Sequence, residues 1–278
     1  SDYLELDYTN NKTQIKAKGR YSFNDKFDDY EIYIINEKDK YDFEFSVGLN
    51  NNPIFIEEID YTKNKDSSSI IKLKANYIKN KDIKFEHVLY SEDKNIIAIS
   101  NLKLSKDYKV KDIDALELNY LNKNKNLNYV KILKSKNKYE LIGDHFDGSS
   151  LVYKLLKGDS NNSFLKIFHN LNSEIVLNID KFYSGNQSYL EKLKGKLIVK
   201  NNKIKSGKIN ALLNKQNKFS LNIKTDSKNE KVTNLYIEKP EPFIKNYKFI
   251  KGFEEGSLSY DKFVTFSFLE SVLILREN

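Results

Sequence analysis

Alternation of apolar and polar residues runs through almost the whole chain, and it restricts the fold more than any other feature. Successive side chains of a β-strand point to opposite faces, so a period of two places one set of residues on each face of a sheet. In residues 71–75 and 102–104 every second residue is Lys. Strands with one Lys-rich face cannot lie in a sheet that is covered on both sides, which argues against a parallel α/β fold.

Turn-forming residues separate the alternating runs, so the sequence predicts an antiparallel meander. In the first part of the chain, the alternation is carried by Leu4, Leu6 and Tyr8, by Ile15 and Ala17, by Ile32 and Ile34, and by Phe43 and Phe45. Longer strands are expected at residues 54–61, 70–78, 83–90, 95–104, 110–120 and 127–133. The alternation resumes from Ile175 to Ile237.

Short helices are expected at a few breaks in this pattern. Leu151, Leu155 and Leu156 predict a helix near residues 149–157, with Asp147 or Ser149 as its cap. Residues 164–171 suggest a second helical turn. Residues 240–250 predict a third helix, because two prolines suit its first turn and apolar residues follow at helical spacing.

Two segments carry a resemblance to a known family. Residues 238–260 give the order strand, short helix, glycine turn and strand, and Gly143-Asp-His-Phe-Asp147-Gly-Ser-Ser-Leu151 leads from a strand end into a Leu-rich helix. Together they resemble the C-terminal region of the AsmA-like family of bacterial envelope proteins, the YhdP/TamB group. The resemblance covers roughly residues 80–278.

The resemblance implies a taco-like β-groove in the periplasm of a Gram-negative bacterium, within a parent protein that is anchored in the inner membrane. Such a groove would bind or bridge phospholipid between the inner and outer membranes through contacts with its acyl chains. The alternating residues that would line it are Ile175, Leu177, Ile179, Leu197, Val199, Ile209, Leu221, Ile223, Leu235 and Ile237. The apolar residues expected to close one end of the groove as a helix plug are Phe243, Ile244 and Tyr247.

The expected fold is therefore mostly β: an elongated, curved antiparallel sheet with two or three short helices. We expect residues 1–278 to form one elongated segment of a longer protein, with a subdivision into residues 1–142 and 143–278. No apolar run approaches the ~18 to 20 residues that span a bilayer, so we expect the parent protein to contact the membrane through parts outside this segment.

Charge and composition argue against several other classes of protein. The formal net charge of 47 minus 39, or +8, is spread thinly, and the only arginines are Arg20 and Arg276. Without an Arg-rich element or a binding motif, we expect no nucleic-acid partner. The chain has no Cys, which excludes disulfides and thiolate metal sites.

The candidate residues for chemistry have simpler structural explanations. His87, His145 and His169 do not show a metal-ligand spacing, and Ser149 and Ser150 lack the Gly-x-Ser-x-Gly arrangement of a nucleophile elbow. We therefore expect no metal, no cofactor and no enzymatic activity.

Two other functions remain compatible with the pattern. A filled core with exposed strand edges would suit a scaffold that supports outer-membrane assembly through contacts with envelope proteins. Exposed aromatic platforms beside polar groups would suit a carbohydrate-binding β-sandwich.

Overall fold

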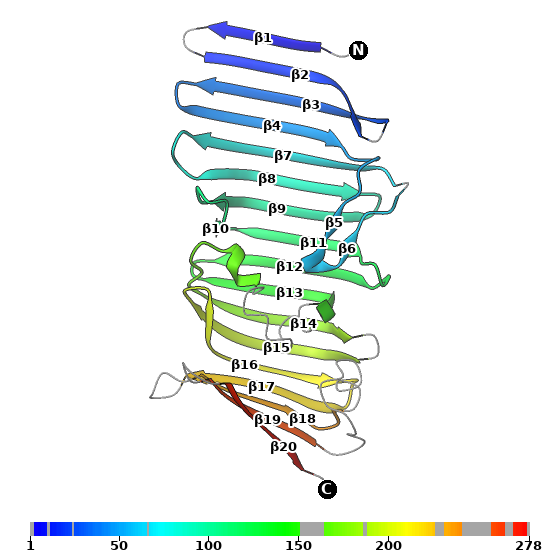
Figure 1. Ribbon diagram of the computed structural model, residues 1–278, viewed down its shortest axis with the longest axis vertical. Helices are drawn as coiled ribbons and strands as arrows, with labels where there is room; N and C mark the ends of the chain where they lie inside the picture. The colour runs from blue at the N-terminus through cyan, green and yellow to red at the C-terminus, as the bar shows by residue number, and fades with distance from the viewer. Residues whose placement is uncertain are drawn as a thin grey trace. The chain divides into compact units, whose positions relative to one another are not determined.

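The structure, a computed structural model, describes residues 3–9, 12–23, 25–65, 67–150, 164–185, 188–225, 231–240, 257–264 and 269–276. Within these ranges the chain is almost entirely strand, which confirms the predicted mostly β fold class (Figure 1). It divides into two compact units: the first contains residues 1–125 and 167–169, and the second contains residues 126–166 and 170–278. The subdivision expected after residue 142 falls inside a strand of the second unit.

The first unit contains one antiparallel sheet whose strands follow the chain order. These strands are β1 (Tyr3–Thr9), β2 (Lys12–Phe23), β3 (Lys26–Glu37), β4 (Lys40–Gly48), β7 (Ser69–Ile78), β8 (Ile83–Glu92), β9 (Asn95–Leu104), β10 (Val110–Asp112) and β11 (Ala115–Leu121). Each strand from β1 to β9 pairs with the next one named, and both β10 and β11 pair with β9. The strands predicted at 70–78, 83–90 and 95–104 are confirmed.

The prediction of a single strand at residues 54–61 is wrong. This segment forms the short strand β5 (Phe55–Ile56), the 3₁₀ turn η1 (Glu57–Ile59) and the short strand β6 (Tyr61–Thr62). The turn ends at Asp60, whose φ of 55° is left-handed, and its N–H donates to the carbonyl of Glu57. Asp is one of the few residues that adopt this conformation readily, so the chain reverses here and β5 pairs with β6.

The strand predicted at 110–120 is interrupted between β10 and β11. The Asp112 carboxylate accepts a hydrogen bond from the N–H of Ile113 at 2.9 Å, and the N–H of Asp114 donates to the carbonyl of Ser100 at 3.2 Å. A side chain that bonds to the adjacent backbone competes with the strand ladder. One predicted strand therefore becomes two.

The second unit contains a sheet of long strands. They are β12 (Leu127–Ser135), β13 (Lys138–Asp147), β14 (Ser173–Gly185), β15 (Ser188–Lys200), β16 (Lys203–Leu213), β17 (Asn217–Thr225), β18 (Lys231–Ile237), β19 (Ser257–Val264) and β20 (Leu269–Arg276). The strand predicted at 127–133 is confirmed by β12. Consecutive strands pair antiparallel, with the exception of β13 and β14.

The β13–β14 pair is parallel, and it is an exception in the predominantly antiparallel pairing that the sequence predicted. Parallel neighbours cannot be joined by a hairpin, and they need a crossover of a dozen or more residues. The chain between Asp147 and Ser173 provides this crossover. It includes the 3₁₀ turn η3 (Phe164–Ile167), which confirms the helical turn expected after residue 163.

The start of the first predicted helix is also observed. Ser149 and Ser150 are helical, and the Asp147 carboxylate accepts a hydrogen bond from the N–H of Ser149 at 3.1 Å. Of the two residues expected as the helix cap, Asp147 is therefore the one observed. The rest of this helix, and the predicted helix at 240–250 with Phe243, Ile244 and Tyr247, lie outside the described residues.

Candidate ligand-binding faces

Cross-strand partners align the apolar residues of the first unit in continuous rows on one face of its sheet. One row consists of Leu4, Ala17, Ile32, Phe45, Leu73, Val88, Ile99 and Leu116, and the next consists of Leu6, Ile15, Ile34, Phe43 and Ala75. Side chains opposite each other on one face are in contact range, so these rows make a continuous apolar surface.

This surface is not covered evenly. Leu4 and Leu6 on β1 are 74% and 67% exposed, and the central residues of β2, β3, β4 and β7 are partly exposed. We call this part the open face; it consists of Leu4, Leu6, Ile15, Ile32, Ile34, Phe43, Phe45 and Leu73. An apolar patch of several neighbouring strands that water reaches is typical of a surface with a binding role.

Aromatic rings form a ladder across the open face. Tyr41, Phe43 and Phe45 follow one another along β4, with ring centroids 6.1 Å apart in both steps and interplanar angles of 8° and 22°. Tyr77 on β7 lies 6.1 Å from Tyr41, its partner across the strands. Tyr41, Phe43 and Phe45 thus stack along β4 and add aromatic surface to this apolar face.

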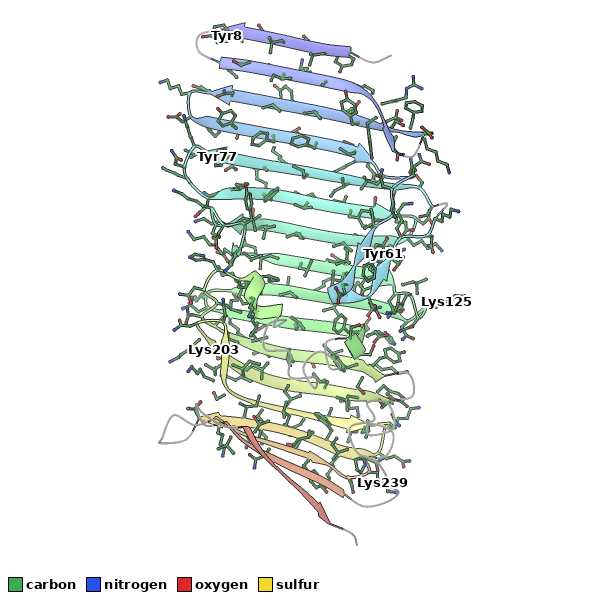
Figure 2. All side chains as sticks on the ribbon, viewed as in Figure 1. Tyr8, Tyr61, Tyr77, Lys125, Lys203 and Lys239 are labelled. Atoms are coloured by element: carbon green, nitrogen blue, oxygen red, sulfur yellow. The ribbon has the colours of Figure 1, made fainter. Side chains whose placement is uncertain are left out.

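At β8, β9 and β11 the same face is covered by residues 49–65 and 67–68 of the connection from β4 to β7, which include β5, η1 and β6. We call them the covering segment. Tyr61 of β6 is fully buried, and its ring contacts those of Tyr90 and Tyr120 edge-on, with centroids 5.7 and 5.6 Å away. Figure 2 shows Tyr61 over the strands, whereas Tyr8 and Tyr77 lie near the ends of theirs. Ile54, Ile56 and Ile59 complete this small core.

A buried carboxylate attaches the covering segment to the sheet. Glu92, at the end of β8, is fully buried and accepts hydrogen bonds from the Tyr61 and Ser67 hydroxyls, from the N–H of Asn64 at 2.7 Å and from the Asn95 amide at 2.9 Å. Burial by itself raises the pKa of Glu92, but these hydrogen bonds outweigh it and hold the pKa below its ordinary value. Burial is the main cause that raises the pKa of Tyr61, so its hydroxyl stays protonated as a donor.

The beginning of the covering segment has its own attachment. Asp28 on β3 is buried and accepts hydrogen bonds from the backbone N–H groups of Asn50 and Asn51 at 3.1 and 3.0 Å. The Tyr21 hydroxyl donates to the carbonyl of Gly48 at 2.6 Å. Lys63 is buried as well, and its ammonium donates to the carbonyl of Asn50 at 2.7 Å. These hydrogen bonds make the covering segment an integral part of the first unit.

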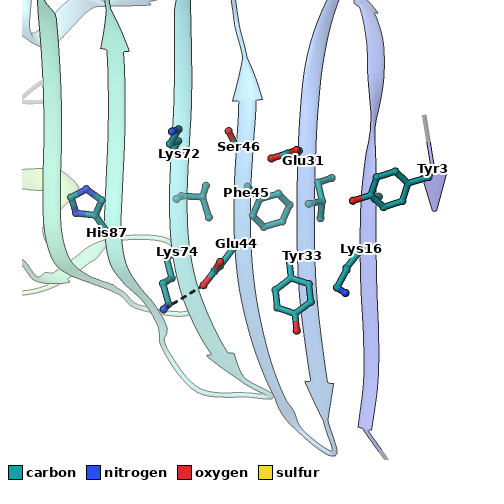
Figure 3. A pocket seen from close by; sticks show the side chains of 13 residues that line it. Tyr3, Lys16, Glu31, Tyr33, Glu44, Phe45, Ser46, Lys72, Lys74 and His87 are labelled. Carbon is teal, nitrogen blue, oxygen red and sulfur yellow. Dashed lines mark ion pairs between the residues drawn. The ribbon is translucent and has the colours of Figure 1, made fainter. Parts of the chain in front are cut away.

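The opposite face of this sheet is charged. A shallow hollow of about 590 Å³ lies on it, and the side chains around it include Tyr33, Glu44, Lys72, Lys74 and His87 (Figure 3). Lys74 lies between Glu44 at 3.3 Å and Glu86 at 3.5 Å. These groups are exposed and neutralise one another, which is typical of a solvated strand face.

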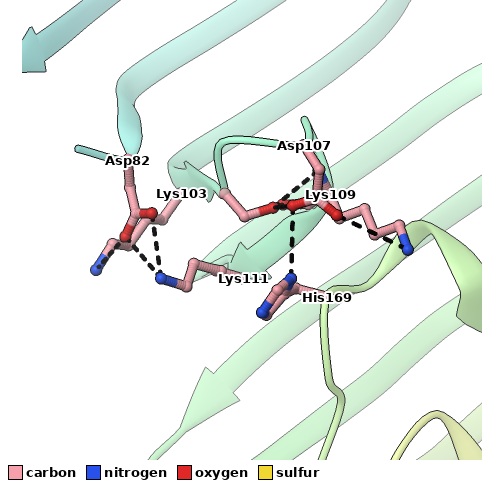
Figure 4. Close-up of polar contacts among 7 residues, drawn as sticks. Asp82, Lys103, Asp107, Lys109, Lys111 and His169 are labelled. Carbon is pink, nitrogen blue, oxygen red and sulfur yellow. Dashed lines mark hydrogen bonds and ion pairs between the residues drawn. The ribbon is translucent and has the colours of Figure 1, made fainter. Parts of the chain in front are cut away.

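A second charged cluster joins turns at the ends of β7–β10 (Figure 4). Asp82 contacts the ammonium groups of Lys103 and Lys111 at 3.2 and 2.9 Å, and the hydrogen bond from Lys111 is the main cause that lowers its pKa. Asp107 lies 3.5 Å from Nδ1 of His169, and its hydrogen bond with Ser105 lowers its pKa. These contacts connect the turns to one another and to His169.

The residues that the sequence predicted as groove lining share one face of the second unit. Ile179, Val199, Ile223 and Ile237 are buried, and the other six are partly buried. Ile179 and Ile237 belong to a core cluster with Val130, Phe146, Leu190, Leu193, Ala211, Leu213 and Phe219, against which Leu177, Ile209, Leu221 and Leu235 pack. Their use as a lipid surface stays a prediction.

Glycines on this second face bring its strands into close contact. Gly195 faces Ile209 across the strands, and a Cβ atom on Gly195 would lie 2.8 Å from Cγ1 of Ile209 and 2.9 Å from the carbonyl oxygen of Lys208. Gly207 leaves similar room for Leu197. Neighbouring side chains thus fill the space above each glycine, as expected where a strand has no side chain of its own.

Sequence reasoning missed the open face as a candidate site. Its alternation was recognised, but exposure depends on what packs above a face, and the sequence gives no direct signal for that. The burial of Glu92 was also missed, because Glu is a typical residue of a solvated strand.

Neither a metal site nor a membrane-spanning helix is found among the residues that the structure describes. His87 is exposed on the charged face, and His169 contacts Asp107. Compared with known proteins, the chain matches no family model, no curated protein and no solved structure. The resemblance to the AsmA-like family therefore rests on the sequence segments 143–151 and 238–260.

Proposed function

We propose that this chain binds the acyl chains of phospholipid along the open face of its first unit. The observation that carries the proposal is the partial exposure of Ile32, Ile34, Phe43 and Phe45 in the middle of a sheet, with the more exposed Leu4 and Leu6 beside them. An apolar face of this kind is costly to leave in water and needs a ligand of matching apolarity.

The chemistry of an acyl chain suits the open face. Each methylene that leaves water contributes about 0.8 kcal/mol, so a ligand with many methylenes gains affinity without specific polar contacts. The rows of apolar residues run from strand to strand and provide a continuous path, and the charged residues lie on the opposite face. The stacked rings of Tyr41 and Phe43, whose planes lie within 8° of parallel, add aromatic surface beside this path.

The cellular location that we propose for this activity is based on the resemblance to the AsmA-like family. As a segment of an AsmA-like protein, the chain would lie in the periplasm of a Gram-negative bacterium and belong to a parent protein anchored in the inner membrane. It would then hold or pass phospholipid between the two membranes, in support of outer-membrane biogenesis. Contact with the membranes themselves would come from parts of the parent protein outside this segment.

A carbohydrate-binding role is the second candidate, and the ring ladder is the observation that favours it. Tyr41 and Tyr77 add hydroxyl groups to this ladder, as a sugar site requires. However, the cross-strand neighbours of Phe43 and Phe45 on this face are aliphatic, and a sugar ring needs polar partners at its edges. The open face offers few such partners, so it suits an acyl chain better.

The test is mass spectrometry of organic extracts from the purified chain, expressed with access to bacterial phospholipid. We expect phospholipid in extracts of the wild type and a loss of most of it in the double variant Phe43→Asp with Phe45→Asp, because an acyl chain on this face would strip water from the new carboxylates. The matched control is Tyr33→Asp with Ile35→Asp, which adds the same charges on the opposite face of the adjacent strand.

Circular dichroism has to show that both variants remain folded. Lipid-free extracts of the wild type would contradict the proposal. Equal lipid retention in the two double variants would also contradict it, since the ligand would then lie elsewhere.

A further inference from the structure

Among the residues that the structure describes, strand β1 lies at an edge of the first unit's sheet. In the described part of the chain it pairs with β2 only, over the full length from Tyr3 to Thr9. Residues 3–8 are all exposed. At an edge, every second residue directs its N–H and C=O groups away from the sheet, where they are available to another strand.

The side chains of β1 are sorted between the two faces. Leu4, Leu6 and Tyr8 extend the apolar face, whereas Glu5 and Asp7 extend the charged face. Edge strands that resist pairing usually carry Lys, a Pro or a bulge. β1 contains none of these: its pairing with β2 is regular, and its only charges are acidic.

On the charged face, acidic and basic residues oppose each other across the strands. Glu5 on β1 lies 3.8 Å from Lys16 on β2, the ammonium of Lys18 bonds to Glu31 on β3, and Glu44 on β4 lies 3.3 Å from Lys74 on β7. Opposite charges on facing strands stabilise a sheet, and like charges destabilise it. The position beyond Glu5 and Asp7 therefore favours a basic residue.

The same rule disfavours a second copy of this strand. An antiparallel pair of β1 strands keeps the apolar residues on one face only in certain registers. Three of these registers pair five or more residues: one places Glu5 opposite Asp7, one places Glu5 opposite Glu5, and one places Asp7 opposite Asp7. A parallel pair in register sets each carboxylate beside its own copy. Acidic residues thus oppose self-association at this edge.

We propose that the β1 edge binds an extended segment of a partner polypeptide in which apolar residues alternate with Lys or Arg. The segment adds a strand to the sheet through backbone hydrogen bonds, as in other cases of β-augmentation. Its basic residues face Glu5 and Asp7, and its apolar residues extend the rows of Leu4, Leu6 and Tyr8. β2 already pairs with β1 in this way on its other side, because Lys16 lies opposite Glu5 and Ile15 lies opposite Leu6.

The test uses a labelled peptide with the sequence of residues 12–20, in which Ile15 and Ala17 alternate with Lys16 and Lys18. Fluorescence anisotropy with the full chain should show saturable binding. The chain variant Glu5→Lys with Asp7→Lys should weaken binding by about ten-fold, since two attractive pairs become repulsive. The control variant Asp29→Lys with Glu37→Lys changes the net charge equally on the interior strand β3, and it should leave the affinity within about two-fold.

Two further peptides separate strand pairing from simple charge attraction. A peptide with Lys16→Glu and Lys18→Glu should not bind, and neither should the original sequence with methylated alternate amides, which cannot donate to the edge. Absence of binding by the original peptide would overturn the proposal. So would undiminished binding of the methylated peptide, an equal effect of the two chain variants, or a wild-type dimer in sedimentation that the Glu5→Lys, Asp7→Lys variant loses.

Discussion

Phe43 and Phe45 of the first unit lie on the apolar face of a sheet and remain partly exposed, whereas Leu213 and Ile237 lie on the apolar face of the second unit and are fully buried. Both units have the same alternation and the same long strands. In the second unit, residues from β12 to β18 pack together in one core cluster. In the first unit a core forms only where the covering segment crosses β8, β9 and β11.

The difference shows that alternation determines which face is apolar and leaves open how far that face is buried. Burial depends on neighbours that are distant in the sequence, such as Tyr61 above Tyr90 and Tyr120. An apolar face with such neighbours contributes to stability. An apolar face without such neighbours is a surface on which the binding of an apolar ligand lowers the free energy.

The largest expected effect compares one isoleucine from each unit. Ile179→Ala on β14 removes a side chain that is 2% exposed, so it should cost about 3 kcal/mol through lost burial and a cavity. Ile34→Ala on β3 removes a partly exposed side chain and should cost about 1 kcal/mol. Denaturant unfolding of both variants measures the difference, and equal losses would show that the two faces are buried alike.

The second prediction concerns the cover of the first unit. Glu92→Gln should cost about 1–3 kcal/mol, because the amide cannot accept all the hydrogen bonds that the buried carboxylate accepts. The pKa of Glu92 is below its ordinary value of 4.5 in the folded chain, so its contribution is complete above that pH and is lost as the pH falls through the folded pKa.

Thermal unfolding between pH 6 and about pH 3 is the measurement, with the wild type expected to lose more stability on acidification than Glu92→Gln. Glu44→Gln serves as the matched control, because its partner Lys74 is exposed and the loss of such a pair costs little. Parallel acid profiles of wild type and Glu92→Gln would mean that this carboxylate does not hold the cover.

A smaller effect is expected from a glycine of the second unit. Gly195→Ala should cost about 1–2 kcal/mol, since the new methyl group would lie 2.8 Å from Ile209 and 2.9 Å from the backbone of Lys208. Gly19→Ala on β2 of the first unit is the control: its nearest neighbour, at 3.1 Å, is the hydroxyl end of the Tyr30 side chain. A stabilising effect of Gly195→Ala in denaturant unfolding would show that the second face is loosely packed.

Much of the local structure could be predicted from the sequence. The strand at 95–104 matches β9 at both ends, and Asp147 caps a helical start as expected. The predicted strands are wrong in extent where a side chain bonds to the nearby backbone, as at Asp112, or where a left-handed residue such as Asp60 reverses the chain. These are local interactions that do not disturb the apolar pattern of their neighbours.

Tertiary features were harder to predict from the sequence. The parallel pairing of β13 with β14 depends on the crossover, and nothing in the alternation of either strand indicates its direction. The groove residues from Ile175 to Ile237 were placed correctly on one face, but their burial was not predictable, because it depends on packing across seven strands from β12 to β18. The open face was overlooked for the same reason.

The most direct test of lipid binding by the open face uses tryptophan as a reporter, since the chain contains none. Phe45→Trp places it on the open face, Tyr33→Trp on the opposite face, and Phe219→Trp in the core of the second unit, where the native side chain is 8% exposed. Each variant is titrated with phospholipid that carries bromine on its acyl chains. We predict strong quenching at position 45 and little at positions 33 and 219; quenching that is equal at positions 45 and 33, or strongest at 219, would contradict the account.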